Sequence, residues 1–180
     1  MRLDEIQLLI ATGRGSASQI QDAFDQIYRE LEHSGSTHLF TALDICHTRI
    51  CAMAVGLFSL YESRLQSKYG WESPFDKLET QLANFGSTNQ LEEFKDFRAA
   101  INVLKHGKGR SHSNLLVRGE RLPFKVQEAL GALVVEGDVC PPSDLILVST
   151  EFLELCCEII EKSWAIVLRE DQSSESRPNL

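Results

Sequence analysis

Residues 37–68, "THLFTALDICHTRICAMAVGLFSLYESRLQSK", form the longest periodic stretch of this 180-residue chain. Apolar side chains recur there at alternating spacings of four and three, which is the a/d pattern of a heptad repeat. The pattern runs through Leu39, Leu43, Cys46, Ile50, Met53, Leu57 and Leu60, and Phe40, Ala54, Phe58, Tyr61 and Leu65 widen it. A helix of this length is about 45–50 Å long at 1.5 Å per residue. Its apolar face has to pack on other helices, in the same chain or in a second copy, so we expect an all-α fold.

Further helices are expected on both sides of this stretch. Apolar spacing predicts one at 18–33, capped by Ser16 or Ser18, with "TGRGSAS" at 12–18 as a linker before it. A short helix should follow Ser73 and Pro74 and close at Gly86. The next is predicted to be capped by Asn89 with Glu92 and to stop at Gly107. The last spans 150–169.

The pattern changes between these last two helices. "LLVRGERLPF" (115–124) indicates a β-hairpin with Gly119 in a type II′ turn, and "ALVVEGDV" (132–139) and "LILVS" (145–149) resemble strands. The expected fold is therefore a helical bundle with a long central helix and a small β-hairpin insertion, about 114–148, before the last helix. Residues 1–169 would form a single domain, and the polar tail 170–180 would be disordered.

The net charge, the apolar runs and the cysteine spacing exclude several classes of protein. The formal net charge is −8, which argues against a protein that binds nucleic acid non-specifically over its whole surface, because such proteins bind by neutralising phosphates. The apolar run near the start is too short for a secretion signal, and "CAMAVGLFSLY" is about half of a membrane span. Cys46, His47 and Cys51 would not converge on one metal ion if they lie on a helix. We expect a soluble cytoplasmic protein with no membrane span, no metal site and no cofactor.

The segment "FRAAINVLKHGKGRS" (97–111) holds the candidate site. On a helix, Arg98, Asn102, Lys105 and His106 share a stripe roughly 100° wide beside the apolar face. Cations are dense in the residues that follow, since Lys105, Lys108, Arg110, Arg118 and Arg121 stand against Glu120 alone, and His112 adds a titratable ring. A phosphate-bearing partner would find its best contact here.

Two interpretations of this stripe are open. In the first, the His106 imidazole moves the proton of a ribose 2′-hydroxyl, and Arg98 stabilises the charge that develops on the phosphate, with no metal required. In the second, Arg98 and Lys105 pair with acidic residues on a neighbouring turn, Asn102 bonds locally, and the Lys-His-Gly sequence only ends a helix.

The sequence resembles the HEPN domain family in two places. "GLFSLYESRLQSK" (56–68) is similar to the first long helix of many HEPN-like proteins, and "FRAAINVLKHGKGRS" carries an Arg, an Asn and a His-Gly near a helix end. The resemblance covers most of 37–169. It implies a small, often dimeric helical bundle from a prokaryotic toxin–antitoxin or antiphage system. Many such proteins are metal-independent ribonucleases, and others are non-catalytic.

The resemblance assigns roles to particular residues. His106 would be the acid/base, with Asn102 one turn before it and Arg98, or in its place Lys105 or Arg110, as the phosphate contact. The density of cations, rather than the resemblance, makes Lys105, Lys108, Arg110 and His112 the candidates for binding RNA phosphates. The expected partners are RNA, a second copy of the chain, and an antitoxin or regulatory protein. The alternative is a non-catalytic helical module that dimerises or docks on a protein through its long heptad helix.

Overall fold

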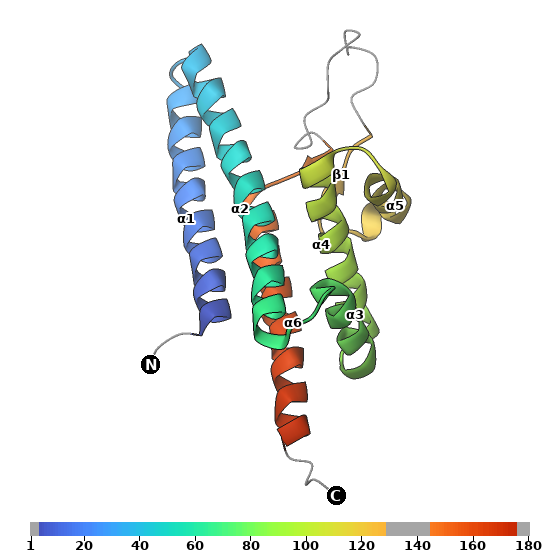
Figure 1. Ribbon diagram of the computed structural model, residues 1–180. Helices are drawn as coiled ribbons and strands as arrows, with labels where there is room; N and C mark the ends of the chain where they lie inside the picture. Colours follow the sequence, from blue (N-terminus) through green and yellow to red (C-terminus); the bar gives the residue numbers. More distant parts are fainter. Residues whose placement is uncertain (1–3, 129–144, 176–180) are drawn as a thin grey trace, which may run out of the picture.

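Six α-helices, one 3-10 turn and a two-stranded antiparallel hairpin make up the part of the chain that the computed structural model describes, residues 4–128 and 145–175 (Figure 1). The elements are α1 (Glu5–Leu31), α2 (Thr37–Tyr69), α3 (Pro74–Phe85), α4 (Thr88–His106), α5 (Arg110–Arg118), η1 (Gly119–Arg121), β1 (Lys125–Val126), β2 (Ile146–Leu147) and α6 (Thr150–Glu175). The predicted class, an all-α bundle with a small hairpin before its last helix, is confirmed.

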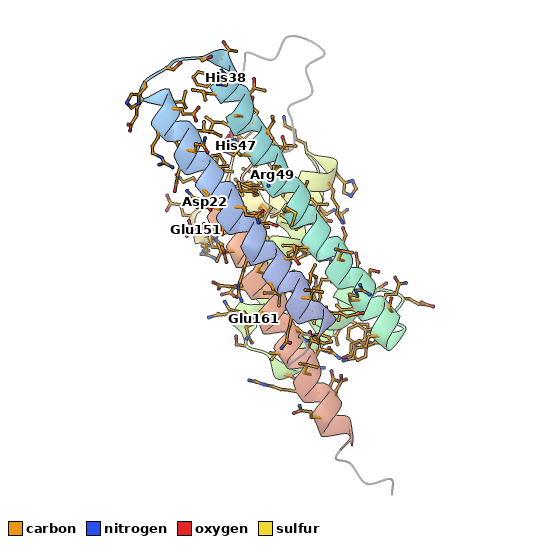
Figure 2. All side chains as sticks on the ribbon, turned by 90° about the vertical axis from the view of Figure 1, so that its left-hand side faces the viewer. Asp22, His38, His47, Arg49, Glu151 and Glu161 are labelled. Atoms are coloured by element: carbon orange, nitrogen blue, oxygen red, sulfur yellow. The ribbon has the colours of Figure 1, made fainter. Side chains whose placement is uncertain are left out.

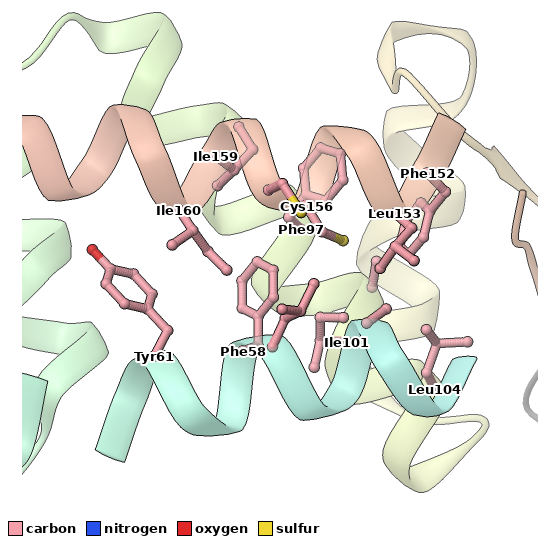
Figure 3. Packing of buried hydrophobic residues seen from close by; sticks show 14 of the residues in the cluster. Phe58, Tyr61, Phe97, Ile101, Leu104, Phe152, Leu153, Cys156, Ile159 and Ile160 are labelled. Atoms are coloured by element: carbon pink, nitrogen blue, oxygen red, sulfur yellow. The ribbon is translucent and has the colours of Figure 1, made fainter. Parts of the chain in front are cut away.

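The long helix α2 lies at the centre of the bundle and packs on α1, α3, α4 and α6. Its heptad residues Ile50 and Leu57 are buried, and so are Phe58 and Tyr61 of the second stripe. Figure 3 shows Phe58 and Tyr61 pointing toward α6, which contributes Phe152, Cys156 and Ile160 to the same cluster. At the ends of the heptad pattern, Leu39 is buried but Leu60 is 52% exposed, contrary to expectation.

Helix α1 begins thirteen residues earlier than 18, the start that the apolar spacing predicted. Asp4 caps it, since its side chain accepts a hydrogen bond from the Gln7 amide while the Gln7 side chain accepts one from the Asp4 amide. The expected linker at 12–18 was wrong, because Gly13 is buried inside this helix. Its missing side chain makes room for Leu57 of α2 and Cys157 of α6. Glycine here permits close helix packing rather than a break.

Helices α3 and α4 form an antiparallel pair whose ends largely match the expectations. Pro74 begins α3, and Gly107, at a φ of +74°, ends α4 after His106. The cap of α4 differs, because Ser87 and Gln90 form the capping box expected for Asn89 and Glu92. The cap of α4 therefore lies two residues earlier than expected, and the buried face of the helix is unchanged.

The predicted hairpin at 115–124 was wrong. Residues 110–118 form α5, and Gly119, at a φ of +50°, ends this helix rather than turning a hairpin. Leu115 and His112 are buried three residues apart, which is helical spacing. The real hairpin pairs Lys125 with Leu147 and Val126 with Ile146. The expected strand at 132–139 lies outside the described residues.

The last helix, α6, continues past Arg169, where the sequence analysis ended it, to Glu175. The prediction of a disordered tail was therefore wrong for 170–175, and 176–180 lie outside the described residues. Asp171 shows why the helix continues, because its carboxylate accepts a 2.6 Å hydrogen bond from the Tyr69 hydroxyl and lies 3.5 Å from the Lys68 ammonium. These contacts anchor α6 to the end of α2.

Helix α2 is long and apolar enough to cross a membrane by length and composition, with a mean hydropathy of 1.4 over its most apolar 18 residues. The core helix of a soluble protein passes the same test, and one face of α2 packs on four other helices. However, only 28% of that window is buried. The exposed face of α2 is therefore unusually apolar for a helix in contact with water.

Candidate functional site

Arg98 holds α3 and α4 together and does not lie with His106. Its guanidinium Nη1 lies 2.8 Å from an Asp76 oxygen and 2.7 Å from a Glu79 oxygen, and it stands over the Phe75 ring. Burial lowers the pKa of Arg98, but the hydrogen bonds to Glu79 and Asp76 outweigh it and raise the pKa overall. Arg98 therefore pairs with acidic residues, as in the second interpretation, but these partners lie on α3 rather than on a neighbouring turn.

His112 is buried rather than open to a ligand, with 5% of its surface exposed. Its Nε2 donates a 2.8 Å hydrogen bond to the backbone carbonyl of Gln127, which follows β1. The imidazole therefore ties α5 to the hairpin. This placement does not fit the expected phosphate contact, because a phosphate cannot reach a ring that is enclosed and already donating.

The connection between α4 and α5 gathers the remaining predicted residues. We call residues 105–110 the basic turn. Lys105, His106, Lys108 and Arg110 are all exposed there, and none of them forms an ion pair or hydrogen bond with another described residue. Asn102 lies half-buried one turn before His106. The structure thus brings together three cations and one imidazole from a six-residue segment.

The start of α5 adds backbone donors to the basic turn. Gly109 precedes this helix and has no side chain to cap it. The first hydrogen bond at this end runs from the Ser113 amide to the Gly109 carbonyl, so the first-turn amides have no helical acceptor. Free amides at a helix N-terminus favour an anion. The local field of the basic turn is therefore positive from both side chains and backbone.

The two other cations noted in the sequence, Arg118 and Arg121, lie outside the basic turn, and Arg121 is exposed in η1. Arg118 forms an ion pair with Glu92, and its Nε lies 2.7 Å from an oxygen of the buried Asp96. Burial raises the pKa of Asp96, whereas the hydrogen bond from Arg118 lowers the pKa of Glu92. Sequence reasoning missed this network, although the spacing of Glu92 and Asp96 by one helical turn, next to the core residue Phe97, was a signal for it.

Among the described residues, no group of three or more His, Cys, Asp or Glu side chains is placed to hold a metal ion. Cys46, Cys156 and Cys157 are buried, free thiols. The chemistry available at the basic turn is therefore that of ammonium and guanidinium groups, backbone amides and one imidazole.

Comparison with known proteins adds no identification. No protein-family model matches the chain, and no curated protein or solved structure matches it.

Proposed function

We propose that this protein binds RNA through the basic turn, as a HEPN-like helical bundle of a prokaryotic toxin or antiphage system in the cytoplasm. The observation that carries the proposal is the set of three exposed cations at 105–110 with no acidic partner among the described residues, in a chain of net charge −8. Elsewhere, Arg14, Arg64, Arg98 and Arg118 each pair with carboxylates. These three cations lie within six residues of one another, and such a cluster in an acidic protein suits a polyanionic ligand.

Phosphates rather than bases are the groups that this site would contact. Lys105, Lys108 and Arg110 offer charge-assisted hydrogen bonds to phosphate oxygens, and the free amides of α5 offer further donors. Few ring-stacking surfaces accompany them, since the turn itself holds a single imidazole. Binding should therefore be salt-dependent and weakly selective for sequence.

Reversing two charges of the basic turn should weaken RNA binding. In the variant Lys105→Glu/Lys108→Glu, we expect the Kd for a labelled single-stranded RNA to rise at least tenfold at 100 mM salt, measured by fluorescence anisotropy. The matched control is Lys77→Glu/Lys95→Glu, which makes the same change of charge at two exposed lysines away from the turn. Equal losses in both variants would reduce the effect to net charge and contradict a site at the basic turn.

His106 is the group of the basic turn that could move a proton. Its imidazole is exposed between Lys105 and Lys108. Because Asp76 and Glu79 already bind Arg98, a lysine of the basic turn or Arg110 would have to stabilise the phosphate during cleavage. If the protein is a metal-independent ribonuclease, it should cut a mixed RNA pool in EDTA, and His106→Ala should abolish cutting while RNA binding persists. If His106→Ala still cleaved RNA, His106 would not be the acid/base. If the wild type bound RNA without cleaving it, the protein would resemble the non-catalytic HEPN-like proteins.

A second candidate function, dimerisation or protein docking, is favoured by the exposed face of α2. Arg49, labelled in Figure 2, is the only Lys, Arg, Asp or Glu between residues 45 and 60. Ile45 and Leu60 are more than half exposed, at 56% and 52%. Between them, a side chain added at Gly56 would meet open space, so another helix could approach closely. The occupant could be a second copy, or an antitoxin or regulatory protein.

The second copy is the simpler occupant to test. We expect sedimentation velocity at about 50 μM to show a dimer of the wild type and a monomer for Ile45→Glu/Leu60→Glu. Val117→Glu is the control, because Val117 is 89% exposed on α5 and outside this face. A monomeric wild type would rule out self-association and leave a different protein as the partner of α2.

A further inference from the structure

A pocket of about 290 Å³ lies where α4, the end of α5, η1 and α6 meet, separate from the basic turn. Its wall combines an apolar part with charged groups of both signs. The apolar part consists of Phe97, Pro123, Leu155 and Ile159, and the polar part of Asn89, Glu92, Glu93, Asp96, Arg118, Arg121, Glu158 and Lys162. Eight of the twelve lining residues are polar or charged, so a ligand that fits this pocket should itself be charged and carry only a small apolar group.

On one side of the pocket the charges already neutralise one another. Arg118 joins Glu92 and Asp96 in close ion pairs, and Asp96 is 6% exposed. These three groups are therefore a rigid part of the wall and have little charge left for a ligand.

The opposite side keeps unused binding capacity. The Lys162 ammonium lies 3.7 Å from a Glu93 oxygen and 3.5 Å from a Glu158 oxygen, beyond the length of a good charged hydrogen bond. Arg121 is exposed and forms no ion pair with another described residue. Two carboxylates and two cations thus border one cavity with most of their hydrogen-bonding capacity free.

We infer that this pocket binds a free α-amino acid with an apolar side chain. The ammonium group of such a ligand would donate to Glu93 and Glu158, and its carboxylate would accept from Arg121 and Lys162. The side chain would cover Pro123 and Leu155, the apolar lining residues that keep exposed surface. The ligand carries both charges on one carbon, which matches a pocket whose free groups are two anions and two cations. A phosphate ester would leave Glu93 and Glu158 without a partner, and a simple amine would leave Arg121 without one.

The test is isothermal titration calorimetry of the full chain with leucine, leucinamide and N-acetyl-leucine. Leucinamide lacks the carboxylate and N-acetyl-leucine lacks the ammonium, so each should bind at least tenfold more weakly than leucine. Arg121→Gln should reduce the preference for leucine over leucinamide, because only Lys162 would still bind the carboxylate. Glu158→Gln should likewise reduce the preference for leucine over N-acetyl-leucine. Glu120→Gln is the matched control, because Glu120 neighbours Arg121 in η1 but does not line the pocket.

Arg121 is exposed and the Glu158 side chain is 46% exposed, so both variants should unfold at the same temperature as the wild type, which circular dichroism checks. Isoleucine, methionine and phenylalanine extend the panel of ligands. The inference is overturned if none of the four amino acids binds saturably at millimolar concentration, or if leucine, leucinamide and N-acetyl-leucine bind the wild type equally well. Neither outcome bears on RNA binding, because the pocket shares no residue with the basic turn.

Discussion

Phe97→Ala is expected to lower the free energy of unfolding by about 4 kcal/mol, the largest effect of a single substitution foreseen here. Phe97 of α4 is 1% exposed. Its ring lies 5.2 Å from that of Phe124, before β1, and 5.5 Å from that of Phe152 in α6, measured between centroids. Alanine would leave a cavity where three segments meet, and the neighbouring aromatic rings could fill only part of it.

Urea denaturation followed by circular dichroism measures this change. Phe85→Ala is the control, since Phe85 is 57% exposed at the end of α3, and it should change the free energy of unfolding by less than about 0.5 kcal/mol. A loss below about 1 kcal/mol for Phe97→Ala would mean that α4 and α6 do not share the packed core described above.

Gly13→Ala is expected to destabilise the protein by about 2 kcal/mol, although alanine normally favours a helix. A methyl group at this position would lie 2.5 Å from the Cys157 sulfur and 2.9 Å from a Leu57 methyl carbon. Real side chains do not approach so closely, so α1 would have to move away from α2 and α6. The cost of that displacement exceeds the gain in helix propensity.

Gly15→Ala provides the matched comparison on the same helix. Gly15 is exposed, and a methyl group there would contact nothing within 4 Å. This substitution should stabilise the protein by about 0.5–1 kcal/mol, because it only reduces the freedom of the unfolded chain and favours the helix. Effects of the same sign for both glycines would contradict the close packing of α1 against α2 and α6.

These two glycines also show where reading the sequence failed. Glycine in "TGRGSAS" is typical of a linker, and only the three-dimensional arrangement shows that Gly13 faces two other helices while Gly15 faces solvent. The long helix α2 was predictable because the four-three spacing of apolar residues continues unbroken over the 22 residues from Leu39 to Leu60, and only a helix places such residues on one face. The end of α4 was also predictable from the sequence, because glycine most readily adopts the positive φ common at the end of a helix, and Gly107 does so.

The candidate site was predictable in part. The density of cations at 105–110 is a property of the local sequence, and the structure leaves those side chains exposed. The fates of Arg98 and His112 depend on residues 15 to 22 positions away, namely Asp76, Glu79 and Gln127. Helical spacing gives the direction of a side chain but not its partner on another helix or strand. The sequence therefore could not show that Arg98 pairs with α3 while Lys105 and His106 stay exposed.

The measurement that tests the central claim most directly is the salt dependence of RNA binding, for the wild type and for Lys105→Glu/Lys108→Glu. Each single-strand phosphate contacted by a cation contributes about 0.7 to the slope of log K against log salt, so losing two contacts should reduce the slope by about 1.4. Lys77→Glu/Lys95→Glu should keep the wild-type slope. Identical slopes for all three proteins would contradict phosphate binding at the basic turn.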